Sequence, residues 1–87
     1  MAQIGGSIEE MRQLQTAFAR EASSVGQLAG TVTSQVSSTW WVGPAADRFR
    51  DQWTAEFRPM LLQLQEALNN SSQEIGRHAE ALMQAGG

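Results

Sequence analysis

The side chains that could do acid–base or metal chemistry are one histidine, His78, and nine aspartates and glutamates. Because the chain has no cysteine and no second histidine, it lacks the ligand set of a zinc site. Serines and threonines are frequent, but none has a base beside it in the sequence, and no phosphate-binding loop occurs. We therefore predict that the protein is not an enzyme and uses no cofactor, metal or small-molecule substrate.

The charged residues of the second half of the chain indicate a solvated surface. Asp47 lies near the N-terminus of a predicted helix, where the helix dipole favours a negative charge. We interpret Arg48, Arg50 and Arg58 as ion-pair partners of neighbouring carboxylates, each exposed pair stabilising the fold by less than about 1 kcal/mol. The net charge of −3 and the absence of a basic cluster predict no nucleic-acid binding.

The segment Trp41-Val42-Gly43-Pro44 lies at the middle of the 87 residues, between two stretches with helical periodicity. Glycine accepts the backbone angles of a helix cap, and proline suits the first position of the next helix. The segment therefore predicts the turn of a helical hairpin, at about residues 40–43. Trp41 is a large apolar group beside this turn and is expected to pack there.

The first predicted helix runs from about residue 7 to residue 39. Ser7 and Glu10 match a capping box, which is typical of a helix start. Gly26 and Gly30 mark either the close approach of a second helix or tolerated surface positions. Apolar residues recur every seven positions, as they do in a helix that packs along one side. The main row is Ile4, Met11, Phe18, Val25 and Val32, flanked by Leu14 and Leu28, and a second row is Ile8, Gln15, Ala22, Ala29 and Val36.

The second predicted helix runs from about residue 44 to residue 84. Pro59 removes one backbone hydrogen bond, so it either kinks this helix near Glu56 or splits it in two. The apolar stripe keeps its phase across Pro59, which favours one kinked helix. That stripe is Phe57, Leu61, Leu64, Leu68, Ile75 and Leu82, with Phe49, Trp53 and Met60 as an additional set in the first half.

These elements predict one all-α domain over residues 1–87, an antiparallel two-helix hairpin. A rod one helix pair thick can bury only one stripe per helix, and apolar residues remain outside that stripe. We expect two hairpins to cover these residues by dimerising into a four-helix bundle, the alternative being a compact monomer with further breaks. The predicted hairpin or dimer interface is Met11, Phe18, Val25, Val32, Phe49, Trp53, Phe57, Leu61, Leu64, Leu68, Ile75 and Leu82.

Trp41 and Gly43 at mid-chain, followed by Pro44, two alanines and Phe49, resemble the WXG-hundred family, whose members are similar to the early secreted antigenic target. The resemblance covers essentially the whole chain. It implies a hairpin that pairs with itself or with a sister WXG protein. It also implies export from a cytoplasmic pool by a type VII (ESX or Ess) secretion system with an FtsK/SpoIIIE-type ATPase. Residues 1–6 carry no positive side chain, which agrees with export without a Sec signal peptide.

The resemblance makes Trp41 and Gly43 the predicted export surface, with packing of the turn as the other interpretation of Trp41. Many family pairs carry a secretion signal of Tyr followed four residues later by Asp or Glu. This chain has no tyrosine, so the ATPase is expected to recognise it either as an assembled dimer or through a sister protein that carries the signal. The alternative function is an intracellular adaptor or targeting chaperone for a larger toxin.

Overall fold

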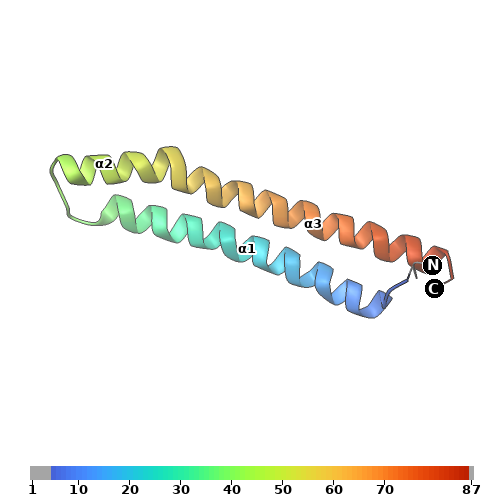
Figure 1. Ribbon diagram of the computed structural model, residues 1–87. Coiled ribbons are helices and arrows are strands. Elements are labelled where there is room, and N and C mark those ends of the chain that lie inside the picture. The colour runs from blue at the N-terminus through green and yellow to red at the C-terminus, as the bar shows by residue number, and fades with distance from the viewer. Residues whose placement is uncertain (1–4, 87) are drawn as a thin grey trace.

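The computed structural model describes residues 5–86, which form a helical hairpin (Figure 1). Helix α1 spans Ile8–Ser38, α2 spans Pro44–Gln52 and α3 spans Arg58–Gln84. A π-helical turn, Trp53–Phe57, joins α2 to α3, so the second arm continues without a loop. Within residues 5–86 there is no strand, and the prediction of an all-α hairpin is confirmed. Ile4, the first member of the predicted main row, lies outside the described residues.

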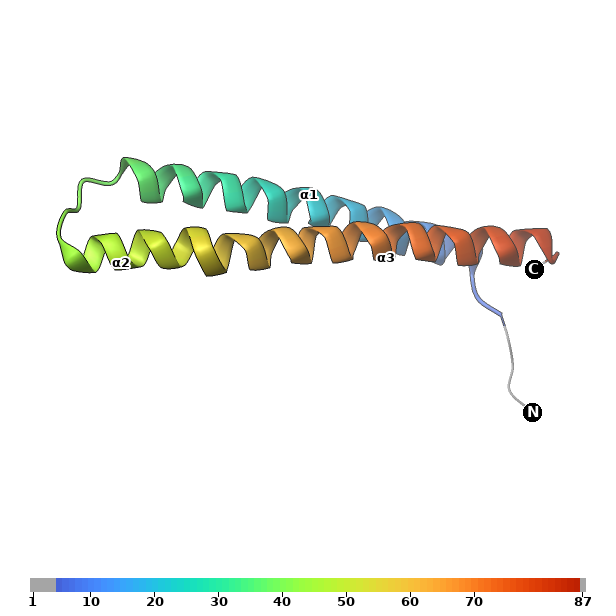
Figure 2. The same ribbon diagram turned by 90° about the horizontal axis from the view of Figure 1, so that it is seen from above.

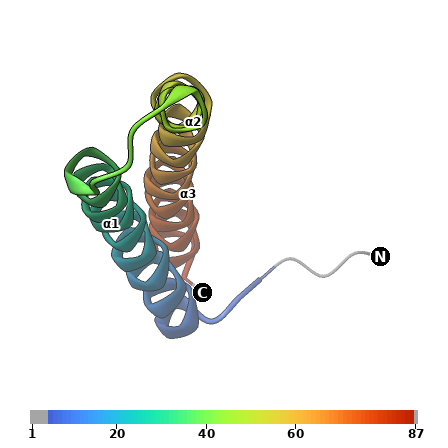
Figure 3. The same cartoon turned by 90° about the vertical axis from the view of Figure 1, so that its left-hand side faces the viewer.

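The hairpin is a rod of 63 × 23 × 15 Å in which the two arms run antiparallel (Figures 1 and 2). Its radius of gyration is 19.3 Å, whereas a compact domain of this length has one of about 12 Å. Seen along the length of the rod, α1 lies beside the arm formed by α2 and α3, and residues 5–86 form no further layer (Figure 3). The alternative of a compact monomer therefore does not describe this chain.

The helix ends follow from local residues. The Ser7 hydroxyl accepts the backbone N–H of Glu10 at 3.2 Å and starts α1. The chain then turns at Gly43, which has φ 122° and ψ 174°, a conformation open only to glycine. Pro44 begins α2 without needing a donor, and the N–H of Asp47 donates to the Gly43 carbonyl at 3.0 Å.

The π turn accommodates Pro59 in the second arm. The proline ring would clash with the carbonyl of Ala55 in a regular helix, and Pro59 has no N–H to offer that carbonyl. In the wider turn the N–H of Arg58 donates to the Trp53 carbonyl, five residues back. The irregularity expected near Glu56 thus takes the form of one extra residue in a continuous arm, visible as the broader yellow turn between α2 and α3 in Figure 1.

The two arms meet along small residues. We use the term seam for the buried residues Ala22 and Ala29 of α1 and Ser72, Gly76 and Ala79 of α3. Small side chains allow two helix backbones to lie close together. On α1 the seam therefore consists of residues of the second row, Ala22 and Ala29, and the main row lies next to the seam.

Two glutamines lie over glycines in this close contact. A Cβ atom on Gly76 would lie 2.6 Å from Nε2 of Gln15, and one on Gly26 would lie 2.5 Å from Nε2 of Gln65. Gly30 has open space around it. Of the two interpretations of the glycine pair, close approach therefore holds at Gly26 and a tolerated surface position holds at Gly30.

Polar contacts between the arms fix their register. The Ser72 hydroxyl donates to the Gln15 carbonyl at 2.9 Å. Near the open end of the hairpin, Arg12 and Glu80 form an ion pair at 3.0 Å. Sliding one arm by a single residue would break both contacts and would also place larger side chains in the seam.

Candidate partner surface and tryptophan turn

Large apolar side chains lie beside the seam rather than in it. On α1, Phe18 and Val25 of the main row precede the seam residues by four positions. On α3, Leu68 and Ile75 precede Ser72 and Ala79 in the same way, and Leu61 lies seven positions before Leu68. Because the helices are antiparallel, these rows lie on one side of the hairpin. We call this side the apolar face and define it as Leu14, Phe18, Val25, Leu28, Val32, Phe57, Leu61, Leu64, Leu68 and Ile75.

The apolar face is only partly covered within the hairpin. Leu64 at its centre is 48% exposed, and no large side chain among the described residues is completely buried. Of the twelve predicted interface residues, only Trp53 is buried, at 8% exposure. The others are half-buried (Met11, Phe18, Val25, Val32, Leu61, Leu68, Ile75 and Leu82) or exposed (Phe49, Phe57 and Leu64).

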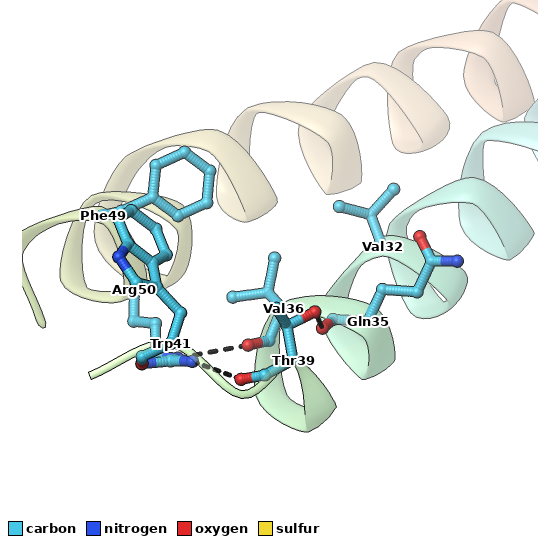
Figure 4. A pocket seen from close by; sticks show the side chains of 7 residues that line it. All are labelled: Val32, Gln35, Val36, Thr39, Trp41, Phe49 and Arg50. Carbon is cyan, nitrogen blue, oxygen red and sulfur yellow. Dashed lines mark hydrogen bonds between the residues drawn. The ribbon is translucent and has the colours of Figure 1, made fainter. Parts of the chain in front are cut away.

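Open cavities lie at both ends of the apolar face, and each is lined by both arms. The cavity at the open end contains Met11, His78 and Leu82. The cavity at the turn end has a volume of about 190 Å³ and is lined by Val32, Gln35, Val36, Thr39, Trp41, Phe49 and Arg50 (Figure 4). The face therefore continues from one end of the rod to the other and reaches the tryptophan turn.

We define the tryptophan turn as residues Thr39–Gly43. The Trp41 ring packs against Phe49 of α2 with ring centroids 5.8 Å apart and remains 44% exposed. Trp40 extends into solvent and is 89% exposed, and Val42 is also exposed. Trp53, the third tryptophan, lies between the arms, where its indole N–H donates to the Thr33 hydroxyl at 3.0 Å.

Arg50 binds the tryptophan turn from α2. Its guanidinium donates to the carbonyls of Val36 at 3.1 Å, Thr39 at 2.8 Å and Trp41 at 2.7 Å (Figure 4). The interpretation of Arg50 as an ion-pair partner on a solvated face is therefore wrong. A signal was present in the sequence, because the last turn of α1 contains no basic residue that could bind its free carbonyls.

The acidic residues and His78 form no reactive group. His78 lies 3.7 Å from Glu74, its neighbour one helical turn away, and both side chains are exposed. Across residues 5–86, no three His, Asp or Glu side chains gather in a way that could hold a metal ion.

The sequence was compared with models of known protein families. The family model described as proteins of 100 residues with WXG matches residues 3–86. The chain belongs to the WXG100 family. This confirms the resemblance based on Trp41 and Gly43. No curated protein and no solved structure matches the chain significantly.

WXG100 proteins are small, secreted helical proteins without enzymatic activity, and the family implies a substrate of type VII secretion that carries no signal peptide. Members typically pair with themselves or with sister proteins. In the described part of this WXG100 chain, no helix has both the length and the apolar composition needed to cross a bilayer.

Proposed function

We propose that this WXG100 protein is exported by a type VII (ESX or Ess) secretion system as a dimer, with itself or with a sister WXG hairpin. The supporting observation is the apolar face, which the hairpin covers only in part. The protein forms a cytoplasmic pool before export, and an FtsK/SpoIIIE-type ATPase recognises it directly or through its partner.

The surface area of the chain supports a partner of similar size. The chain exposes 6504 Å², whereas a compact monomer of 9.5 kDa exposes about 5,000 Å². The excess of about 1,500 Å² is larger than the ~800 Å² that each partner contributes to a standard protein interface. Covering the apolar face with a second hairpin produces a four-helix bundle and reduces this excess.

The position of the tryptophan turn supports a role in export. Trp41 borders the cavity at the turn end of the apolar face, so a partner hairpin on that face ends beside it. Trp41, Gly43 and the partner then form a composite export surface. A Trp41→Ala variant is expected to keep the dimer and lose export, whereas loss of both together would assign Trp41 to packing alone.

The experiment that tests the dimer uses two leucines with similar exposure. Leu64 lies on the apolar face and Leu62 is 40% exposed, and two positions of separation place them about 200° apart around the helix. Leu64→Glu puts a charge into the proposed interface and is expected to weaken the dimer at least 100-fold. Leu62→Glu carries the same charge and is expected to leave the dimer intact.

Light scattering after gel filtration gives the mass of each variant, and immunoblots of cells and culture medium give its export. We expect the wild-type protein and Leu62→Glu to be dimeric and exported, and Leu64→Glu to be neither. Equal masses for the two variants would contradict the assignment of the face. A wild-type dimer that stays inside cells with an active type VII system would favour the alternative function, an intracellular adaptor or targeting chaperone for a larger toxin.

A further inference from the structure

The guanidinium of Arg50 makes three hydrogen bonds to one short segment of backbone. Its acceptors are the carbonyls of Val36 in the last turn of α1, Thr39 at the helix end and Trp41 in the turn. A guanidinium presents its donors in a rigid planar fork, so three simultaneous bonds fix the relative positions of the three carbonyls. Arg50 therefore sets the path by which the chain leaves α1.

The end of α1 needs such a donor. The last carbonyls of a helix have no partner within the helix, and they form the negative end of its dipole. No basic residue lies in the last turn of α1, and Thr39 caps it in an extended conformation, without the glycine that often closes a helix. Arg50 supplies both the donors and the positive charge from the opposite arm.

The two neighbouring tryptophans differ in how they are held. The Trp41 carbonyl accepts from Arg50 and its ring packs on Phe49, so consecutive residues of α2 hold both its backbone and its side chain. Trp40 is nearly fully exposed. The turn therefore presents one tryptophan in a defined orientation beside the apolar face.

We propose that Arg50 is the positioning residue of the tryptophan turn, and that its three-bond fork holds Trp41 in the orientation used for export. The export part of this inference depends on the proposed function. The positioning part concerns the free hairpin and can be tested independently of secretion.

The test uses the full chain and three variants. Arg50→Ala removes the fork, Arg50→Lys keeps the charge but not the planar fork, and Arg48→Ala removes an equal charge from an exposed site two residues away. The first readout is the ¹⁵N relaxation order parameter of Trp41 and Val42, with circular dichroism and light scattering to establish that helicity and mass are unchanged.

We expect the order parameter of Trp41 to be close to the rigid value of about 0.85 in the wild-type protein and in Arg48→Ala. In Arg50→Ala it should fall below about 0.6, the range of a flexible loop. Arg50→Lys should resemble the alanine variant because an ammonium group cannot bind three fixed carbonyls at once. A rigid turn in Arg50→Ala, or an order parameter of wild-type size in Arg50→Lys, would show that the three hydrogen bonds of Arg50 are not what keeps the turn rigid.

The second readout is export, compared at equal cellular amounts of protein. We expect Arg50→Ala to be exported at least tenfold less than the wild-type protein and Arg48→Ala to be exported equally well. Normal export of Arg50→Ala with a flexible turn would overturn the positioning role. If the wild-type protein is not exported, the proposed function fails, and the order parameters still decide whether Arg50 holds the turn.

Discussion

The shaft of the hairpin, where α1 packs on α3, and its turn end are held together by different kinds of residue. The shaft packs through alanine, glycine and serine, with Ala29 and Ala79 almost completely buried. At the turn end Ala46 is also buried, but large groups join the two arms there, in particular Trp53 between the arms and Arg50 across the turn. Small residues bring the shaft helices close together but remove little apolar surface from water.

The two regions also differ in how far their large side chains find partners within the same chain. At the turn end, the indole of Trp53 and the guanidinium of Arg50 find their partners within the same chain. Along the shaft, Phe18 and Leu64 remain partly in water. We therefore expect the turn end to contribute most to the folding of the single hairpin and the shaft to contribute most to association.

The largest expected effect is the loss of Trp53. Trp53→Ala removes the one large buried side chain of the turn end and leaves the Thr33 hydroxyl without the indole donor. We expect the free energy of unfolding to fall by about 3–5 kcal/mol, measured by urea titration at fixed protein concentration. Trp40→Ala is the control and should change it by less than about 0.5 kcal/mol, because Trp40 is exposed. Similar losses of stability in the two variants would mean that the burial of Trp53 at the turn end does not stabilise the hairpin.

A larger residue in the seam tests whether the shaft depends on small side chains. Ala79→Leu must separate the two shaft helices or strain their side chains, so we expect a loss of about 1–3 kcal/mol. Ala81→Leu, at an exposed position on the same helix, is the matched control. Thermal unfolding followed by circular dichroism measures both, and a stable Ala79→Leu protein would mean that the arms do not need their close approach.

Gly43 tests whether the turn depends on backbone conformation alone. A Cβ at this position meets no atom within 4 Å, yet φ is 122°. Gly43→Ala should therefore cost at least about 1 kcal/mol through backbone strain. A fully stable Gly43→Ala protein in urea titration would show that the turn adopts another path.

The smallest expected effect distinguishes two glycines of α1. Gly30→Ala adds a methyl group in open space and should stabilise the hairpin by about 0.5–1 kcal/mol, because alanine favours helix. Gly26→Ala should gain less, since the new methyl group meets the Gln65 side chain. Equal gains in stability for the two variants, measured by differential scanning calorimetry, would show that the arms do not approach closely at Gly26.

Much of this fold can be predicted from the sequence because its signals are local. The hydroxyl of Ser7 caps α1 three residues away, and Gly43-Pro44 ends one arm and starts the next. The position of Trp41 and Gly43 within a short helical chain was also enough to indicate the WXG100 family. Seven-residue periodicity showed that each arm has an apolar side.

Periodicity does not show which of two neighbouring rows packs inside the hairpin. The largest apolar row of α1 includes Phe18 and Val25, but the buried row includes Ala22 and Ala29. The choice depends on how close two backbones can approach, and that is a property of the pair of helices rather than of either sequence segment. The extra residue of the π turn also shifts the phase between Trp53 and α3, which leaves Met60 exposed.

Local patterns in the sequence specify the helices, the place of the turn and the surplus of apolar side chains, because each depends on residues a few positions apart. The packing of the two arms, by contrast, determines that small residues form the seam and that Arg50 binds the carbonyls of the tryptophan turn. Those contacts join residues on different arms. Their geometry depends on the distance and register of two packed helices, which no local pattern specifies.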